Sequence, residues 1–154
     1  MVKQITPTEA YEMLKDDPER TFIVDVRTRA EYIFIGHAST AYNIPYLFWT
    51  PAKDEKSGYK KNSHFVSDFA KKFKKTDKIL VMCRSGNRSV PSCKLLEEAG
   101  FKSIFEIPDG FEGKRVSDKN SIYYAHRCCI NGWKHNGLPW TYKIKEDLSY
   151  KDKQ

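Results

Sequence analysis

The strongest hydrophobic signals in the chain are short, mostly apolar runs rich in β-branched residues. Residues 22–26, 78–82 and 103–107 have this character, which is typical of strands buried on both faces of a parallel sheet. A shorter strand is expected at 42–44, where Pro45 ends it. Because helical segments alternate with these runs, the sequence predicts an α/β fold with a central, mainly parallel sheet and helices on both faces.

The intervening segments carry the helix signals, at residues 6–15, 28–32, 62–75 and 89–99. Thr6 or Thr8, followed by Glu9, is expected to cap the first helix. Phenylalanines at four-residue spacing make the third segment amphipathic. Pro91 near the start and Gly100 after the end mark the fourth segment as the best-defined helix.

One loop stands out chemically, because it joins the best strand to the best helix. Its residues, Cys83 to Ser89, are small and turn-forming except for Arg84 and Arg88. If the loop curls around its first residue, backbone N–H groups, the helix N-terminus and both guanidinium groups surround the Cys83 thiol. Such a thiol should ionise more readily than a free cysteine, and an anion would bind in the same cradle. Cys93, by contrast, lies on the expected buried face of the helix and is predicted to be core.

Four sequence signatures occur along the chain in a fixed order. They are Asp25-Val26-Arg27 followed by Glu31; Gly36-His37-Ala38 followed by Ala41, Asn43, Ile44 and Pro45; Cys83 to Ser89; and Asp109-Gly110-Phe111-Glu112-Gly113 with Trp133 and Gly137-Leu138-Pro139. With these residues the chain resembles the rhodanese family over residues 4–113 and again over 132–139. The resemblance implies a three-layer α/β domain of the rhodanese type that carries a sulfur atom as a persulfide on the loop cysteine.

The chemistry that the resemblance implies agrees with the residues of the loop. A Cys83 thiolate can attack the outer sulfur of thiosulfate or a polysulfide, and cyanide or a thiol then removes that sulfur, so the reaction requires no metal or other cofactor. Arg84 and Arg88 suit the anionic oxygens of the donor, while the loop N–H groups suit the thiolate and the persulfide. The candidate site has Cys83 as the nucleophile, Arg84, Ser85, Gly86, Asn87, Arg88 and Ser89 binding the substrate, and Asp25 and Arg27 in support.

The resemblance also implies roles for residues around the loop. Arg27 is expected to pair with Glu31, so that Asp25 and Arg27 support the site structurally. His37 belongs to a turn signature and is expected to be a hydrogen-bonded structural residue rather than a general base.

Two other functions stay open. Cysteine phosphatases and arsenate reductases have a related loop with five residues between cysteine and arginine, whereas four separate Cys83 from Arg88. A smaller ring of donors suits a single sulfur better than a tetrahedral phosphate. A persulfide carrier that serves a dedicated partner protein and turns over free thiosulfate poorly would have the same loop, so the sequence does not separate carrier from enzyme.

The other thiols and imidazoles do not form a typical metal site. His126, Cys128, Cys129 and His135 include adjacent cysteines, which point in different directions, and the Cys-x-x-Cys spacing of zinc sites is missing. A role for Cys128 or Cys129 in resolving a Cys83 persulfide stays open.

Two insertions distinguish the chain from a minimal rhodanese. We expect one domain over residues 4–142, insertions at 46–63 and 114–131 that help form the rim of the active site, and a polar C-terminal tail at 143–154. The second insertion is rich in aromatic residues, which usually bury against something. Packing of the two insertions on each other, or on Trp140 and Tyr142, is therefore the alternative.

Charge and composition constrain the partners. The chain has 27 Lys and Arg against 20 Asp and Glu, a net charge of +7, so its surface should attract anions. Nucleic acid is not expected, because the lysines are scattered rather than gathered in one stripe. No run approaches the ~20 apolar residues of a membrane span, and residues 1–20 lack a signal-peptide core.

We therefore expect no membrane association. The chain as given is expected to be soluble and cytoplasmic, or periplasmic if an export signal was removed. The expected partners are a small anionic sulfur donor and a thiol or cyanide acceptor, with a sulfur-accepting protein in the case of a carrier.

Overall fold

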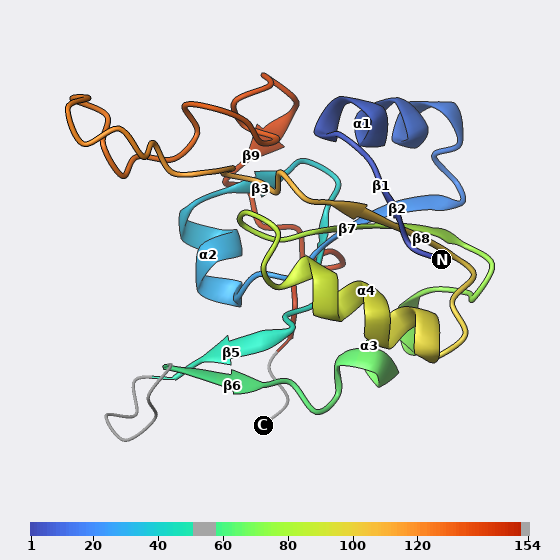
Figure 1. Ribbon diagram of the computed structural model, residues 1–154. Helices are drawn as coiled ribbons and strands as arrows, with labels where there is room; N and C mark the ends of the chain where they lie inside the picture. The colour runs from blue at the N-terminus through green and yellow to red at the C-terminus, as the bar shows by residue number, and fades with distance from the viewer. Residues whose placement is uncertain (51–57, 152–154) are drawn as a thin grey trace.

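A five-stranded sheet forms the centre of the structure, a computed structural model that describes residues 1–50 and 58–151 (Figure 1). Its strands lie in the order β1-β8-β7-β2-β4, and every neighbouring pair is parallel. They are β1 (Lys3–Gln4), β2 (Thr21–Asp25), β4 (Tyr42–Asn43), β7 (Lys78–Met82) and β8 (Ser103–Ile107). The predicted α/β fold is therefore confirmed, and β1 is an added edge strand that is too short to show a hydrophobic pattern.

Helices cover both faces of this sheet, as predicted (Figure 1). The first face carries α1 (Pro7–Asp16) and α2 (Arg29–Phe34), and the second carries α3 (Phe65–Lys72) and α4 (Ser89–Glu98). Along β7, Ile79 and Val81 pack in the core under α3 and α4, while Leu80 and Met82 pack in the core under α1 and α2. The two-residue period of the strand divides its apolar side chains between the two cores.

Capping boxes start the two helices of the first face. At α1 the Glu9 N–H donates to Thr6 Oγ1 at 3.1 Å, and the Thr6 N–H donates to the Glu9 carboxylate at 2.7 Å. Thr6, not Thr8, is therefore the cap. Thr28 and Glu31 form the same reciprocal pair at the start of α2, immediately after the end of β2.

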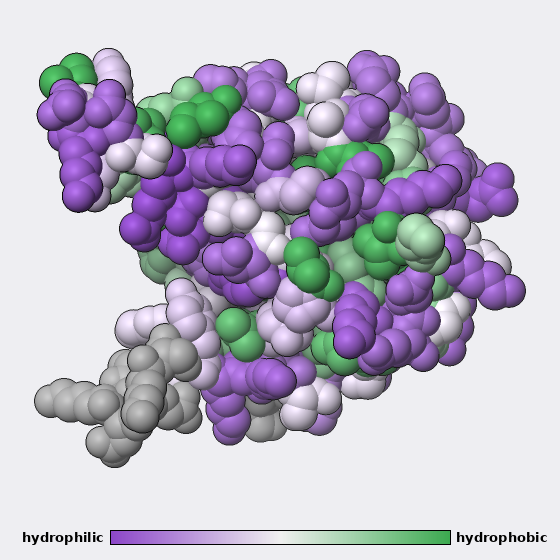
Figure 2. Space-filling model, in the orientation of Figure 1, coloured by the Kyte–Doolittle hydropathy of each residue, from purple (hydrophilic) through white to green (hydrophobic). Residues whose placement is uncertain are grey.

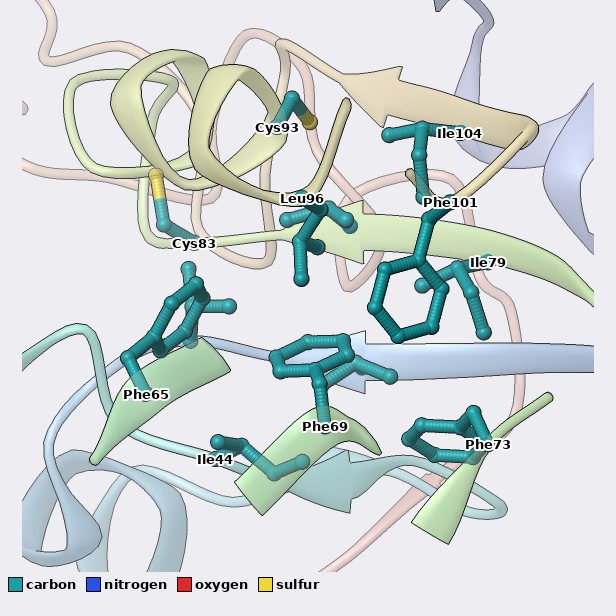
Figure 3. Packing of buried hydrophobic residues seen from close by; sticks show 13 residues of the cluster. Ile44, Phe65, Phe69, Phe73, Ile79, Cys83, Cys93, Leu96, Phe101 and Ile104 are labelled. Atoms are coloured by element: carbon teal, nitrogen blue, oxygen red, sulfur yellow. The ribbon is translucent and has the colours of Figure 1, made fainter. Parts of the chain in front are cut away.

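Phenylalanines of α3 and the residue after it fill the core of the second face. Phe65, Phe69 and Phe73 are each at most 5% exposed, and successive ring centroids lie 4.9 and 5.7 Å apart. Figure 3 shows this row on the side of α3 that faces Leu96 of α4. Cys93 belongs to the same cluster, which confirms it as a core residue.

Two short antiparallel pairs flank the main sheet. One joins β3 (His37–Ala38) to β9 (Trp140–Thr141), and the other joins β5 (Leu47–Trp49) to β6 (Tyr59–Lys61). The β5–β6 hairpin is built from the first predicted insertion, of which residues 51–57 lie outside the described residues. Residues 114–131, which we call the arm, contain no helix or strand and project from the body as the orange segment in Figure 1.

The C-terminal segment packs on the body, which corrects the expectation of a polar tail. Leu148 and Tyr150 are 8% and 6% exposed, and the Leu148 carbonyl accepts from the Asn43 N–H at 2.8 Å. The Tyr150 hydroxyl donates to Asp68 of α3 at 3.0 Å, and its ring packs against Phe48 of β5. The segment has too few apolar residues for a periodic pattern, and it buries Leu148 and Tyr150 while Ile144 stays exposed.

No helix in the described ranges exceeds 10 residues, whereas a helix that crosses a bilayer needs ~20 apolar residues. The face shown in Figure 2 is mostly hydrophilic, with small separate apolar areas.

Candidate active site

The loop from Cys83 to Ser89 lies at the carboxyl end of β7, the middle strand of the sheet. Sites in open α/β sheets form at this end of the strands. Cys83 is 1% exposed, and its Sγ accepts a hydrogen bond from the Gly86 N–H at 3.1 Å. In Figure 3 the sulfur points toward α4 and away from the phenylalanine row. The loop therefore curls back on its first residue, as predicted.

Gly86 makes this curl possible. Its φ is 103°, a conformation that residues with a side chain rarely adopt, and a Cβ there would meet the Pro108 carbonyl oxygen at 2.9 Å. The segment after β8 also binds the start of the loop, because the Phe111 N–H donates to the Cys83 carbonyl at 2.8 Å. The chain that follows β8 thus holds the loop in its curled form.

A small cavity of about 180 Å³ lies next to the sulfur. Its lining consists of Cys83, Arg84, Ser85, Asn87 and Arg88 of the loop and of Leu47 and Tyr59 of the β5–β6 hairpin. The first insertion therefore contributes two residues to the lining of this cavity, and the second insertion contributes none. A larger cavity of about 490 Å³ lies between α1 and the C-terminal segment, but no cysteine lines it. We place the candidate site at the smaller cavity because Cys83, the candidate nucleophile, lines it.

The two arginines of the loop have different surroundings. Arg88 makes a bidentate ion pair with Glu31 of α2, at 2.5 and 2.8 Å. Burial alone would raise the pKa of Glu31, but the ion pair outweighs burial and holds this pKa below its usual value. Arg84 has a buried Nε without a hydrogen-bond partner among the described residues. Arg84 therefore has an unused donor, whereas the Arg88 guanidinium is engaged within the protein.

Arg27 pairs with Asp25, and the expected pairing with Glu31 is wrong. Arg27 Nη2 lies 2.6 Å from Asp25 Oδ2, and both side chains are 0% exposed. Arg27 also donates to the Gly36 carbonyl at 2.7 Å and lies 4.4 Å from the centroid of the Phe111 ring. Glu31 instead closes the cap of α2 and turns toward the loop. The Asp25–Arg27 pair thus joins the end of β2 to the segment that follows β8.

Two further residues have the structural roles predicted for them. Cys93 is 2% exposed, and burial raises the pKa of its thiol far above the ordinary value. His37 has ring nitrogens 2.8 Å from the Tyr32 carbonyl oxygen and 3.0 Å from the Lys143 carbonyl oxygen. Neither side chain lines the cavity.

Glu106 of β8 is a buried acid next to the site, and it belongs to none of the four sequence signatures. Its Oε1 accepts from Ser89 Oγ at 2.8 Å, and Ser89 Oγ lies 3.6 Å from Cys83 Sγ. The available signal was an acidic residue between Phe105 and Ile107 in a mostly apolar strand, near the end that faces the loop.

The arm is joined to the loop at its base. The Glu112 N–H donates to the Arg84 carbonyl at 3.1 Å, and the Glu112 carbonyl accepts from the Cys128 N–H at 2.7 Å. Burial, followed by the charges of Arg84 and Arg115, lowers the pKa of Arg127. The arm therefore brings positive charge close to the loop.

The tip of the arm is exposed. Ile122, Tyr123 and Tyr124 are 85%, 54% and 48% exposed, and Tyr123 packs on His126 of the same segment with ring centroids 6.0 Å apart. The alternative expectation, that the aromatic residues of this insertion bury against the rest of the chain, is therefore wrong for Tyr123 and Tyr124.

The described ranges contain no group of three or more His, Cys, Asp or Glu side chains that could hold a metal ion. All four cysteines have free thiols. His135 Nδ1 lies 3.2 Å from the Cys128 carbonyl oxygen, so this imidazole contacts the backbone of the arm.

Known proteins are similar to the chain over most of its length. The Rhodanese-like domain family pattern matches residues 6–114. An uncharacterized protein of Rickettsia conorii is 34% identical over 143 residues, which are 92% of this chain and 98% of that protein. The chloroplastic thiosulfate sulfurtransferase 16 of Arabidopsis thaliana is 32% identical over 116 residues, 75% of this chain and 76% of that protein. A crystal structure of a protein from M. tuberculosis has a TM-score of 0.75 at 30% identity and covers 92% of this chain and 98% of its own.

Proposed function

The chain belongs to the Rhodanese-like domain family, and on that basis we propose that it is a sulfurtransferase with Cys83 as the sulfur-carrying nucleophile. Thiosulfate or a polysulfide gives a sulfane sulfur to Cys83, and cyanide or a thiol accepts it. The observation that carries the proposal is the position of the Cys83 sulfur, which the Gly86 N–H contacts at 3.1 Å beside a cavity lined by two arginines. The relative named as a thiosulfate sulfurtransferase supports this class of donor.

The reaction consists of two displacements at sulfur. The Cys83 thiolate attacks the outer sulfur of thiosulfate, an Sγ–S bond forms, and the S–S bond of thiosulfate breaks with its electron pair leaving on sulfite. Cys83 then carries a persulfide anion. Cyanide or a thiolate attacks the terminal sulfur, forms thiocyanate or a new persulfide, and returns Cys83 as a thiolate. Charge balances in both steps, and neither an oxidant nor a reductant is consumed.

The loop amides are suited to the anionic forms of Cys83. The Gly86 N–H donates to the sulfur, and the N–H groups of Ser85 and Asn87 have no acceptor in the described part of the chain. Both residues line the cavity. Unpaired N–H groups at a cavity stabilise negative charge, so they would stabilise the terminal sulfur of a persulfide.

Arg84→Ala should slow transfer from thiosulfate more than transfer from polysulfide. The unpaired Nε of Arg84 can bind the sulfonate oxygens of thiosulfate, which polysulfide lacks. Loss of a charge-assisted hydrogen bond costs about 1.5–3 kcal/mol, which corresponds to about 10- to 150-fold in kcat/KM. With polysulfide the loss should stay below about threefold. The measurement is kcat/KM for both donors with cyanide as the acceptor.

Arg88→Ala is the matched comparison for this prediction. Because the Arg88 guanidinium pairs with Glu31, its removal should disturb the loop and lower the rates with both donors together. An equal loss with both donors in Arg84→Ala would mean that Arg84 shapes the loop and does not bind oxygens.

A persulfide carrier is the second candidate function, and the exposed aromatic residues of the rim favour it. Trp49 and Tyr59 of the hairpin are 61% and 37% exposed, and Tyr59 lines the cavity. Exposed aromatic residues beside a site are typical of protein contacts. A carrier would gain sulfur quickly but lose it slowly to cyanide or small thiols. Mass spectrometry of sulfur gain and sulfur loss separates the two functions.

Phosphate-ester hydrolysis is not favoured. The loop has one residue fewer between Cys83 and Arg88 than a cysteine phosphatase, and Glu31 occupies the Arg88 guanidinium. Hydrolysis of an aryl phosphate should therefore remain at background.

Replacing residues 116–129 with a short Gly-Ser linker should change donor preference more than stability. Because the tip is exposed, its loss should cost less than about 1 kcal/mol of unfolding free energy, or about 2–4 °C in Tm. The replacement also removes Arg127, whose pKa is lowered by burial and by the charge of the nearby Arg84. We expect kcat/KM for thiosulfate to fall about fivefold relative to polysulfide, the effect of losing ~1 kcal/mol from a rim charge.

Arg127→Ala is the control, because it removes the charge and keeps the arm. It should reproduce the change in donor ratio with no loss of Tm. A large drop in Tm with an unchanged donor ratio would show that the arm is structural.

A further inference from the structure

A row of three buried side chains leads from the nucleophile to the carboxylate of Glu106. The Cys83 thiol donates to Ser89 Oγ at 3.6 Å, and Ser89 Oγ donates to Glu106 Oε1 at 2.8 Å. Cys83 follows β7 and is 1% exposed, and Ser89 begins α4 and is 0% exposed. Glu106 lies in β8 and is 3% exposed. The pairing of β7 with β8 places Glu106 beside Val81, on the face of the sheet that α4 covers.

The single hydroxyl proton of Ser89 sets the direction of this row. Ser89 Oγ lies 3.1 Å from the Gly86 carbonyl oxygen and 2.8 Å from the Glu106 carboxylate. The carboxylate is the closer acceptor and the charged one, so it forms the stronger hydrogen bond. The serine oxygen can then accept the thiol proton of Cys83.

The carboxylate of Glu106 has neutral partners. Gln4 of β1 donates to its second oxygen at 2.9 Å, and no basic side chain in residues 1–50 and 58–151 lies within ion-pair distance. A buried negative charge without a cation is costly, and a proton removes that cost. Glu106 is therefore suited to share a proton with the nucleophile.

We propose that Ser89 and Glu106 carry the thiol proton of Cys83 during each cycle. The S–H bond breaks as its proton passes to Ser89 Oγ, the Ser89 proton passes to Glu106 Oε1, and the row then holds a thiolate and a carboxylic acid with unchanged total charge. The reverse transfer restores the thiol after sulfur has left Cys83. This role rests on the proposed function, because the first displacement needs a Cys83 thiolate and the second releases one. Glu106 acts through Ser89 and is a positioning residue.

Other titratable groups lie around the row. Arg84 and Arg88 of the loop line the cavity with Cys83, and Cys93 of α4 feels the charges of Cys83 and Glu106. The charges of Glu31 and Asp25 act on Arg88, and that of Glu97 acts on Cys93. Burial lowers the pKa of Arg88, but its ion pair outweighs burial and raises that pKa above the ordinary value. Burial, followed by the charges of Glu106 and Cys83, raises the pKa of Cys93. Arg88 and Cys93 therefore keep their charge states between about pH 5 and 8.

Alkylation of Cys83 by iodoacetamide tests the proton transfer without a sulfur donor. The rate is followed by mass spectrometry on the peptide that contains Cys83, because Cys128 and Cys129 can also react. If the row shares one proton, the thiolate fraction is nearly constant between about pH 5 and 7, and the wild-type rate changes less than about threefold there. In Ser89→Ala and Glu106→Gln the rate should rise about tenfold per pH unit and fall at least about tenfold below wild type at about pH 5.5.

Ser92→Ala is the matched control. Ser92 is also a buried serine of α4, but its hydroxyl donates to the Arg88 carbonyl at 2.6 Å. Its profile should match that of the wild type. Ser89→Thr keeps a hydroxyl and should restore the flat profile, and circular dichroism shows whether each variant is folded.

A purely electrostatic effect of Glu106 would have the opposite sign. Removing its negative charge would by itself favour the thiolate, so Glu106→Gln would react faster than wild type near pH 6. Faster alkylation of Glu106→Gln would overturn the proposal. So would a wild-type alkylation rate that rises tenfold per pH unit, or a Ser92→Ala variant whose rate is no longer constant between about pH 5 and 7. None of these outcomes depends on sulfur transfer. A protein with the flat profile but without sulfur transfer would contradict the proposed function and leave the proton row intact.

Discussion

Cys83→Ser is expected to lower sulfur transfer from thiosulfate to cyanide at least about 1,000-fold. Serine has a similar size, but its hydroxyl is a much weaker nucleophile and cannot hold a persulfide. The fold should persist, because the curl of the loop also depends on Gly86 and on the backbone bond between Phe111 and Cys83. Thiocyanate formation measures the activity, and mass spectrometry measures the gain of one sulfur atom.

The double variant Cys128→Ser, Cys129→Ser is the control for this loss. Both thiols lie outside the lining of the cavity, so most of the activity should remain. Undiminished sulfur transfer in Cys83→Ser would contradict the proposed role of Cys83 as the nucleophile. Loss of transfer in a folded double variant would add a second redox thiol to it.

Asp25→Ala should lower the free energy of unfolding by about 3–5 kcal/mol. The change leaves the guanidinium of Arg27 buried without its anion, and both side chains are 0% exposed in the intact pair. The remaining hydrogen bond from Arg27 to the Gly36 carbonyl cannot neutralise the charge. Urea unfolding followed by circular dichroism gives the difference.

Glu98→Ala is the matched control, because it removes the carboxylate of an exposed ion pair with Lys94. It should cost less than about 0.5 kcal/mol. Adding Arg27→Met to Asp25→Ala removes the stranded charge and should recover part of the stability. A loss in Asp25→Ala no larger than that of the control would contradict the anchoring role of the buried pair.

The sheet and the curled loop could be predicted because local rules determine them. The run from Lys78 to Met82 shows its strand through continuous apolar residues, and the helix after Arg88 shows its limits through Pro91 and Gly100. The position of Cys83 follows directly, since a loop between such a strand and helix lies at the carboxyl edge of the sheet.

Partner choice among charged side chains could not be predicted in the same way. Asp25 and Glu31 are both close to Arg27 in sequence, but the capping box of α2 turns Glu31 toward Arg88. Which acid an arginine pairs with depends on where each side chain points, and this is set by how the helices and strands pack. The contact between Glu106 and Ser89 could not be predicted for the same reason, because it depends on the register between β7 and β8.

The burial of the C-terminal segment matters for how the protein is produced for kinetics. Tyr150 packs on Phe48, whose neighbour Leu47 lines the cavity, so the last described residues support one wall of the site from behind. A truncation before Leu148 would therefore alter the entrance to the site as well as the terminus. A C-terminal affinity tag that displaces Tyr150 from Phe48 would have the same effect. Met1 is fully exposed, so a tag at that end would leave this support in place.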